Sequence, residues 1–388
     1  MPPTGHALLG ASSAHRWLAC PPSARLEESV RVRIGDTTSE AAAEGTLAHS
    51  LVELKLNRLL AGRKSGKATL QIKNDPLYRP VMEDYTDDYI GYVMEIFAQA
   101  QVDSPDAKLM SELRVDFSDI VPDGFGTTDT IIIADDTMHV IDFKYGKHVK
   151  VEAKGNPQLR LYAWGAYREY GVLYDIKTVV MHIVQPRMEN TDVESMPLWE
   201  LTDWAYDVVQ PIASRAAEGQ GEFAPGEHCF FCRAQSTCRA YAERQMEMAA
   251  FTFRDPVELT DEEIADLLPK VDEIVRWASK LKDYALDQAV RHEHILPGYK
   301  LVEGRANRKI TDPRLAAYKL RQHGLEDDQM YTLKGLGDLE AVVGKKALSE
   351  LLGDLIHKPQ GKPVLVPESD KRPALSSAAR AADLFKDD

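Results

Sequence analysis

Apolar residues recur along the chain with two different periods, and these periods predict its secondary structure. Leu47, Leu51 and Leu54 lie at helical spacing and predict a helix over residues 37–61. Aromatic and valine residues repeat in the same way farther along and predict a second helix over 76–101, with these side chains in the core. Two long amphipathic helices therefore precede the rest of the chain.

The pattern then changes to stretches rich in Val, Ile, Thr and Phe, which are typical of strands. We expect strands at 109–117, 127–134 and 138–144, with a hairpin turn between the last two. A helix over 156–170 and a strand over 177–185 follow. This order of elements predicts an α/β core.

Beyond the core, a helix over 199–218 leads into a cluster of cysteines. We divide the chain into a first domain at 1–250, a mostly helical C-terminal domain at 251–357 and an extended tail at 358–388. The C-terminal elements that we expect are a helix capped by Thr260 at 261–292, a short strand at 299–302, and small helices at 312–323 and 345–356.

All four cysteines fit one metal-binding pattern. Cys229, Cys232 and Cys238 stand together, whereas Cys20 lies more than two hundred residues upstream. Four thiolates bind zinc, whose ligands usually come as two close pairs. A group of three plus one distant cysteine instead favours a [4Fe–4S] cluster. Either metal would tie the two ends of the first domain together.

Asp142 and Lys144 end the apolar strand 138–144, and strand alternation places both side chains on one face. A metal ion bound by the carboxylate and a polarised water held by the ammonium would explain why two charged side chains lie together. Asp129 on the preceding strand, in the pattern Gly126-x-x-Asp129, would supply a second carboxylate. An Asp-x-Lys pair alone also fits a surface ion pair, so the second pattern is what favours the metal interpretation.

Other candidates lie on the predicted helices and first strand. His49 could be a ligand for Mn²⁺ or Fe²⁺, although a lone helical histidine is more often structural. Glu53, one turn later, could orient it, and Glu112 is a further acid near the site. Gln158 and Tyr162 share one helical face and could contact a phosphate or a base, with helix packing as the alternative.

Charge and composition limit the possible partners. The net charge of −14 argues against a protein that coats nucleic acid, yet residues 143–160 carry five basic residues against Glu152. We see no apolar run of about 18 residues and no signal peptide, so we expect a cytoplasmic protein without a membrane partner. In a reducing compartment, closely spaced cysteines more often bind metal than form disulfides.

At this point the chain resembles a known family. Four motifs match, in order, those of RecB-like nucleases of the PD-(D/E)xK superfamily: His49, Gly126-x-x-Asp129, Asp142-x-Lys144 and Gln158-x-x-x-Tyr162. With its four cysteines the chain resembles the iron–sulfur branch, which includes the AddB nuclease domain and CRISPR-adaptation exonucleases. Residues 142–147 and 155–162 also resemble a phage and prophage family of this type.

The resemblance implies a restriction-endonuclease-like fold, with a mixed central sheet flanked by helices and a helical iron–sulfur cap. It implies metal-dependent hydrolysis of DNA, with Mg²⁺ or Mn²⁺ bound by His49, Asp129, Asp142 and the Phe143 carbonyl. Many relatives have Glu at the third of these positions. Lys144 would position the attacking water.

Further expectations concern DNA contacts and the biological role. Gln158, Tyr162 and Lys147 would line the DNA track, and a basic stretch with Arg305 and Arg308 would contact phosphates, unless it pairs with acids at 261–264. The implied role is an exonuclease in phage recombination or replication, working with a single-strand-binding or annealing protein. The alternatives are a nucleic-acid-binding or assembly module with a vestigial site, and a zinc-stabilised scaffold.

Overall fold

A five-stranded mixed sheet forms the centre of the computed structural model, which describes residues 7–35, 39–61, 66–147, 149–250, 260–302 and 310–357. The strands lie in sequence order across the sheet: β1 (Lys108–Asp116), β2 (Phe125–Ala134), β3 (Thr137–Phe143), β4 (Thr178–Gln185) and β5 (Asn190–Pro197). β3 and β4 are parallel, and the other three neighbouring pairs are antiparallel. The expected α/β class and the three antiparallel strands are confirmed.

The β2–β3 hairpin supplies the buried middle of the sheet. Ala134 pairs with Thr137 across the turn, as the sequence predicted. Most residues of both strands are buried, because helices cover both faces of the sheet. Alternation sends Ile131 and Ile133 to one face and Ile132 to the other, where they join separate apolar cores.

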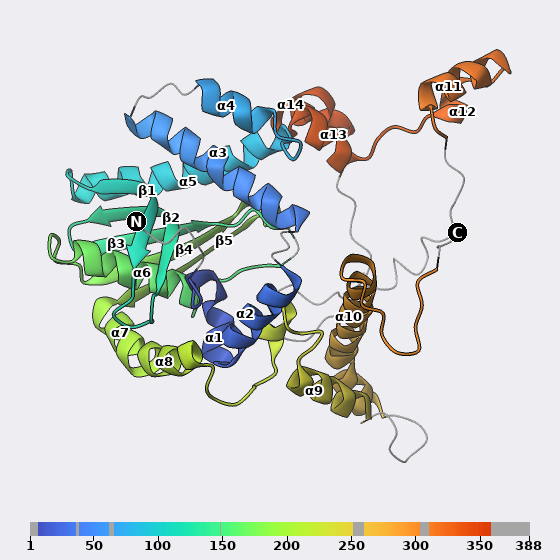
Figure 1. Cartoon of the computed structure of the whole chain (residues 1–388). Helices are drawn as coiled ribbons and strands as arrows, with labels where there is room; N and C mark the ends of the chain where they lie inside the picture. Colours follow the sequence, from blue (N-terminus) through green and yellow to red (C-terminus); the bar gives the residue numbers. More distant parts are fainter. Residues whose placement is uncertain are drawn as a thin grey trace.

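Helices form a layer on each side of the sheet (Figure 1). One layer contains α3 (Glu40–Ala61), α4 (Gly66–Lys73) and α5 (Val81–Asp103), and the other contains α6 (Pro157–Tyr170), α7 (Leu198–Asp203) and α8 (Gln210–Glu218). Tyr89 and Val93 of α5 are fully buried against the sheet, which confirms them as core residues. A π-helical turn, η3 (Trp204–Val209), joins α7 to α8 within the helix predicted at 199–218.

The helix α6 connects the parallel strands β3 and β4 and begins where the sequence predicts it. The Asn156 side chain accepts hydrogen bonds from the backbone N–H groups of Gln158 and Leu159 at its N-terminus. Pro157 occupies the first turn, where a missing N–H costs nothing. This cap fixes the start of the helix that carries Gln158 and Tyr162 next to the end of β3.

The N-terminal segment folds against elements from the far end of the first domain. It forms η1 (Ala11–Ser13), α1 (Ala14–Ala19) and α2 (Ser23–Ile34), and these pack on α8 and on η4 (Glu227–Phe231). Ser12 and Ser13 are residue types that commonly cap a helix, and Ser13 is the N-cap residue of α1, but its hydroxyl donates to the Gly10 carbonyl instead of accepting from the helix. The pattern Thr37-x-x-Glu40 predicts a capping box at the start of α3, and Thr37 lies outside the described residues.

The C-terminal region is helical: α9 (Arg239–Ala250), α10 (Asp261–Arg291), α11 (Pro313–Gln322), α12 (Asp327–Met330), α13 (Leu336–Val343), α14 (Lys345–Leu352) and η6 (Gly353–Leu355). The expected Thr260 cap is confirmed, because its hydroxyl accepts from the Glu263 N–H and the Glu263 carboxylate accepts from the Thr260 N–H. The strand expected at 299–302 is wrong. Tyr299 and Val302 are exposed, and this stretch pairs with no strand in the described part of the chain.

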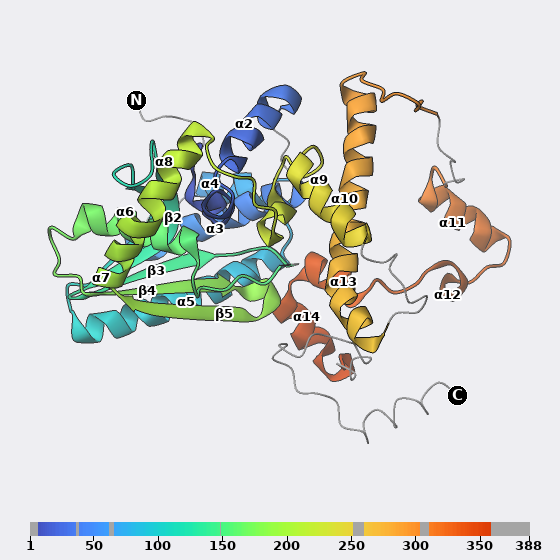
Figure 2. The ribbon, with the colours of Figure 1, turned by 90° about the horizontal axis from the view of Figure 1, so that it is seen from below.

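Contacts among the described residues attach α10, α13 and α14 to the elements that precede them. Glu273 on α10 accepts hydrogen bonds from Arg244 and Gln245 of α9, and α13 and α14 pack on α5 at Asp84 (Figure 2). The division into three domains stays a prediction. Arg305, Arg308 and the tail at 358–388 lie outside the described residues. Within the described ranges, no helix combines the length and apolar character needed to cross a membrane.

Candidate metal centre and cysteine pocket

Two buried carboxylates meet where β2 and β3 lie side by side. Asp129 and Asp142 are 8% and 3% exposed. The Asp129 Oδ2 accepts a hydrogen bond of 2.7 Å from the backbone N–H of Phe143, which fixes its side chain against the end of β3. The antiparallel register pairs Thr130 with Ile141, so the two aspartates are neighbours across the hairpin. The backbone therefore holds both acids in place.

Lys144 completes a hydrogen-bonded group around Asp142. Its Nζ lies 3.0 Å from Asp142 Oδ2 and donates to Gln158 Oε1 at 3.0 Å. The Gln158 amide donates in turn to Asp142 Oδ1 at 3.1 Å and to the Tyr162 hydroxyl at 3.2 Å. The structure thus brings together four of the residues that the sequence singled out.

His49 approaches the same carboxylates from α3. Its Nδ1 lies 2.9 Å from Asp129 Oδ1, and its ring packs edge-on against Phe143 with centroids 5.2 Å apart. Possible ligand atoms of His49, Glu112 and Asp129 all lie within 4.8 Å of one another. Glu112 comes from β1, where its φ of 49° interrupts the regular strand geometry. These three residues converge from three elements on one point.

The charges in this centre alter one another's protonation. Burial raises the pKa of Asp142, and the neighbouring Asp129 carboxylate raises it further. Burial acts to lower the Lys144 pKa, but the two aspartates outweigh it and raise that pKa. Burial also acts to lower the His49 pKa, yet Asp129 raises it overall. Negative charge therefore exceeds what Lys144 and His49 neutralise.

Glu112 shows this excess most clearly. Burial and the Asp129 charge raise the pKa of Glu112 to about 7. A divalent cation between Glu112, Asp129 and His49 would relieve the repulsion that raises it. Carboxylate oxygens with one imidazole are a donor set that suits Mn²⁺, and the oxygens suit Mg²⁺. The residues present therefore fit a divalent metal ion.

Gly126 and Tyr162 form one wall of the centre. A Cβ at Gly126 would come within 2.6 Å of the Tyr162 ring, so glycine is required for this close approach. Tyr162 is 6% exposed, and burial raises the pKa of its hydroxyl well above the usual value. Lys147, expected to contact DNA, is an exposed residue on the loop after β3.

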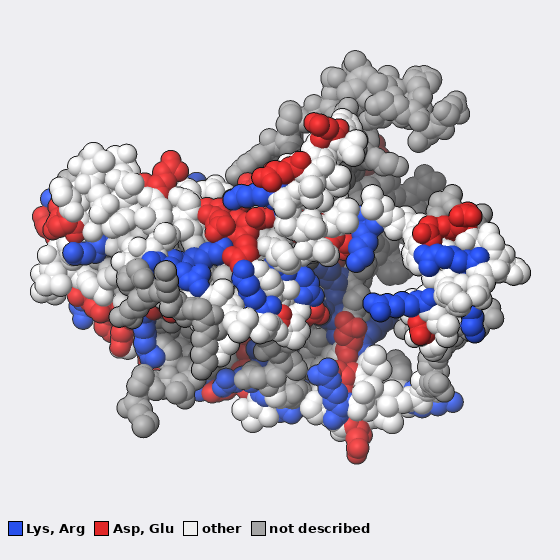
Figure 3. Space-filling view, turned by 90° about the horizontal axis from the view of Figure 1, so that it is seen from above, with Lys and Arg blue, Asp and Glu red and all other residues white. Residues whose placement is uncertain are grey.

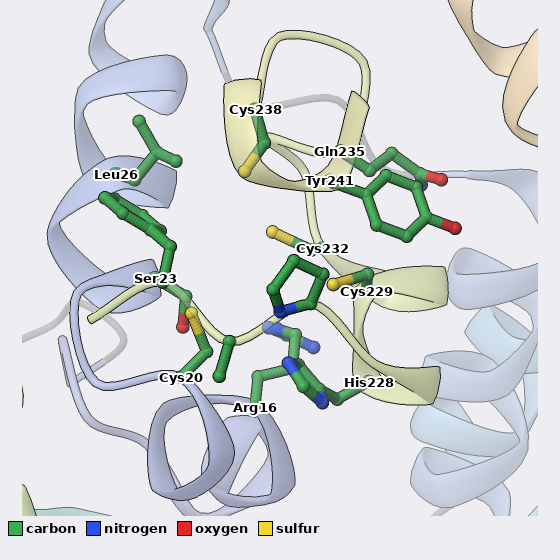
Figure 4. Close-up of a pocket in the computed structure, with 13 residues that line it drawn as sticks. Arg16, Cys20, Ser23, Leu26, His228, Cys229, Cys232, Gln235, Cys238 and Tyr241 are labelled. Atoms are coloured by element: carbon green, nitrogen blue, oxygen red, sulfur yellow. The ribbon is translucent and has the colours of Figure 1, made fainter. Parts of the chain in front are cut away.

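The four cysteines line a second site, a small pocket between the N-terminal helices and the η4 loop (Figure 4). Figure 4 shows their sulfur atoms turned toward the same space. Cys20 lies at the end of α1, Cys229 lies in η4, and Cys232 and Cys238 lie in the loop before α9. The fold therefore brings Cys20 to its three distant partners.

The thiols in this pocket are free and mostly buried. Burial raises the pKa of Cys20 and Cys229, and it raises the pKa of Cys232 to about 12. A bound metal would reverse this by stabilising the thiolates. Arg16 also lines the pocket and could offset thiolate charge, whereas burial lowers the pKa of His228 and favours its neutral form. Four convergent thiols with one cationic neighbour fit a four-thiolate metal site.

Glu112 is the residue whose importance the sequence indicates least. It lies on a strand with little alternation, and its closeness to Asp129 depends on the β1–β2 register. Its one signal is an acid in a strand that precedes the Gly126-x-x-Asp129 pattern. The Phe143 carbonyl as a metal ligand stays a prediction.

Comparison with known proteins places the chain in a family. A family described as "Protein of unknown function (DUF2800)" matches residues 6–373. The chain belongs to that family. Among solved structures, one titled "Crystal structure of SSO0001" is similar over 60% of this chain and 85% of its own, at 15% identity and a TM-score of 0.27. A likeness at that score supports no inference about fold or function.

Proposed function

We propose that this protein is a metal-dependent DNA nuclease with a restriction-endonuclease-like core of the RecB-like type. The convergence of His49, Glu112, Asp129 and Asp142 beside Lys144 carries the proposal. Several carboxylates, one imidazole and one ammonium gathered near the end of β3 are the groups that phosphodiester hydrolysis uses. A vestigial site would not need to retain all of them.

Each residue has a role in this reaction. His49, Glu112, Asp129 and Asp142 would hold Mg²⁺ or Mn²⁺, which would supply Lewis-acid activation of the phosphodiester. Lys144 would hold the attacking water and offset charge on the phosphate oxygens. The water oxygen bonds to phosphorus and gives up a proton to solvent, the bond to the leaving sugar oxygen breaks, and that oxygen takes a proton from solvent. Gln158 keeps Lys144 and Asp142 oriented through its two hydrogen bonds.

The cysteine pocket supports a second part of the proposal. The four thiols would hold a [4Fe–4S] cluster, with a four-thiolate zinc ion as the alternative. The three-plus-one arrangement of the cysteines favours the cluster. Bound metal would join α1 to the loop before α9 and act as a clasp rather than in catalysis.

The proposed role is an exonuclease that acts on cytoplasmic DNA in phage recombination or replication. A single-strand-binding or annealing protein would be its partner. The sequence resemblance supports this role.

One experiment tests the proposed activity. Protein purified without oxygen is incubated with end-labelled single- and double-stranded DNA, with Mn²⁺ or with EDTA. We expect cleavage with Mn²⁺ and its loss with EDTA and in Asp142→Asn protein. If folded, metal-loaded wild type leaves both substrates intact, the nuclease proposal is wrong and a DNA-binding module becomes the better interpretation.

A further inference from the structure

Two phenylalanines lie exposed between two of the clustered cysteines. Phe230 and Phe231 are 41% and 52% exposed, and their rings stand nearly perpendicular with centroids 4.6 Å apart. They occupy the end of η4, directly between Cys229 and Cys232. Two adjacent large apolar side chains in water lose the stabilisation that burial would give them, so a binding role is the natural explanation.

Their position connects them to the metal centre. The Phe231 ring packs edge-on against His15 of α1, with centroids 6.2 Å apart. Burial and the nearby Arg16 charge lower the pKa of His15 to about 4. Ala11, one turn earlier, lies next to the site of Gly126 and Tyr162. The segment from Ala11 to His15 therefore spans from the wall of the metal centre to Phe231.

A polar cleft runs along the same segment. It has a volume of about 590 Å³ and is bordered by Gly126 and Tyr162 at the metal centre and by Arg233, which follows Cys232. Arg16 lines both this cleft and the cysteine pocket. The cleft thus leads from the metal centre toward the loop that carries the two phenylalanines.

Basic groups accompany the apolar rings. The Arg276 guanidinium on α10 lies 5.7 Å from the centre of the Phe230 ring. Arg16 pairs with Glu27, and the cleft is lined by three arginines and two glutamates, so it carries little net positive charge. On the face shown in Figure 3, Lys and Arg side chains lie among Asp and Glu side chains in the same way. Electrostatic attraction alone would hold a DNA strand weakly here, and base stacking would supply additional binding affinity.

We propose that Phe231, backed by Phe230, is a stacking surface for a nucleobase of the DNA strand whose phosphate lies at the metal centre. This inference rests on the proposed nuclease function and adds a substrate contact to it. Every base has an aromatic face, so such a contact serves an enzyme without sequence preference. Because the rings lie between two cysteines, bound metal in the pocket would also fix their position. Loss of one stacked base lowers affinity by roughly 5- to 150-fold.

An abasic scan tests the contact directly. The probe is a short fluorescein-labelled single strand in which one abasic nucleotide is moved stepwise from each end. Affinity is measured by anisotropy with full-length, anaerobically purified protein that carries Asp142→Asn to prevent cleavage. Phe231→Ala and Phe231→Trp are compared in this background. For the parent protein, we expect an abasic nucleotide at one position to lower affinity about tenfold relative to unmodified DNA. We expect Phe231→Ala to bind unmodified DNA about tenfold more weakly than the parent does.

The affinity loss from the abasic nucleotide and the affinity loss from Phe231→Ala should not be additive. Phe231→Ala should show no further penalty at the sensitive abasic position, whereas Phe231→Trp should keep both the affinity and the penalty. Trp199→Ala is the matched control, since Trp199 is 66% exposed on α7. That helix begins beside Lys177, at the opposite end of β4 from the metal centre. Equal metal content and melting temperature would show that the variants fold alike.

Three outcomes would overturn the inference. They are normal affinity in Phe231→Ala, a full abasic penalty in that variant, or no sensitive position in the parent protein. If Phe231→Ala instead abolishes association with another protein, the phenylalanines form a protein contact. Cleavage by wild type alongside any of these results would leave the nuclease proposal intact. Failure of wild type to cleave or bind DNA would count against the nuclease itself.

Discussion

The metal centre and the cysteine pocket differ in how their reactive groups are partnered. In the metal centre, Asp142 contacts Lys144 and Gln158, and Asp129 contacts His49 and the Phe143 N–H. In the cysteine pocket, burial raises the pKa of Cys20, Cys229 and Cys232, and the hydrogen bonds described for these thiols are mostly with backbone groups, such as the one that Cys229 accepts from the Gly226 N–H. The first site keeps its shape through its own ion pairs, whereas the second gains strong partners when metal binds.

The comparison indicates a different task for the proposed metal in each site. A site whose carboxylates are already held by ion pairs and hydrogen bonds would need a metal for chemistry. A site of buried thiols needs one for folding, because metal binding that requires the folded arrangement stabilises that arrangement. Changes in the metal centre should therefore affect rate more than stability, and changes in the cysteine pocket should do the reverse.

The largest expected effect is on rate, from Asp142→Ala. Loss of this carboxylate removes a metal ligand and the partner of Lys144, so cleavage should fall by about 10²–10³-fold or more. Single-turnover cleavage of end-labelled DNA with Mn²⁺ measures it. Asp88→Ala, which removes an exposed acid on α5, is the control and should cleave normally. Undiminished cleavage by Asp142→Ala would remove this residue from the active site.

The second effect is on stability, from Cys20→Ser. In the proposed clasp this cysteine would close a loop of more than two hundred residues, and losing such a cross-link should lower the free energy of unfolding by about 2–4 kcal/mol. Urea unfolding under anaerobic conditions measures it, together with iron, sulfide and zinc content. Wild type should be brown.

EDTA treatment of wild type provides the contrast. It should abolish cleavage while changing the unfolding free energy far less than Cys20→Ser does. If EDTA treatment and Cys20→Ser lowered the free energy of unfolding equally, the proposed difference between the two sites would be wrong. Stoichiometric zinc without iron would exclude the iron–sulfur cluster but keep the clasp.

The third effect is a pH dependence of metal binding. The Glu112 pKa is raised to about 7, so below pH 7 this carboxyl is protonated in metal-free protein. Mn²⁺ must displace that proton, and affinity should therefore fall by up to about tenfold per pH unit below pH 7. Calorimetry in two buffers of different ionisation enthalpy measures the released proton. Glu112→Gln should release less, and unchanged release would show that Glu112 is not the group that loses it.

The smallest expected effect is a local loss of stability next to the cysteine pocket, where hydrogen bonds join α9 to α10. Glu273→Ala removes hydrogen bonds to Arg244 and Gln245 and should cost about 1 kcal/mol locally. Faster amide hydrogen exchange in α9 and α10 would report it. Asp266→Ala, at an exposed position on α10, should leave exchange unchanged. If exchange in Glu273→Ala also stays the same, bound metal alone holds this region.

The sequence predicts those parts of the molecule in which a local pattern determines the structure. Strands β1–β3 and helix α6 follow from alternation and from the Asn156–Pro157 start, and Asp129, Asp142, Lys144 and Gln158 lie on these elements. Their contacts need the β2–β3 hairpin and the helix that follows it, both close in sequence. Motifs that are short in sequence were therefore sufficient to predict that these residues lie together.

Elements defined by distant partners were missed. The strand β5 is largely polar, with Asn190 and Met196 as its buried residues, so its pairing with β4 defines it. The helix α2 carries no clear apolar stripe and packs on α8, far along the chain. The wrong strand at 299–302 has strand-like composition but no neighbour in the described structure. The local amino-acid composition does not reveal whether the segment has a neighbouring strand with which it can form a sheet.

The position of Cys20 imposes an order on biosynthesis. The five strands are neighbours in the sheet in the order in which the ribosome makes them, so each strand finds its partner as it emerges. Cys20 leaves the ribosome first among the four clustered cysteines, but its pocket is complete only after Cys238 has followed. Insertion of the proposed metal would therefore come after the sheet has formed, and a nascent chain shortened before Cys238 would carry a finished sheet without an assembled pocket.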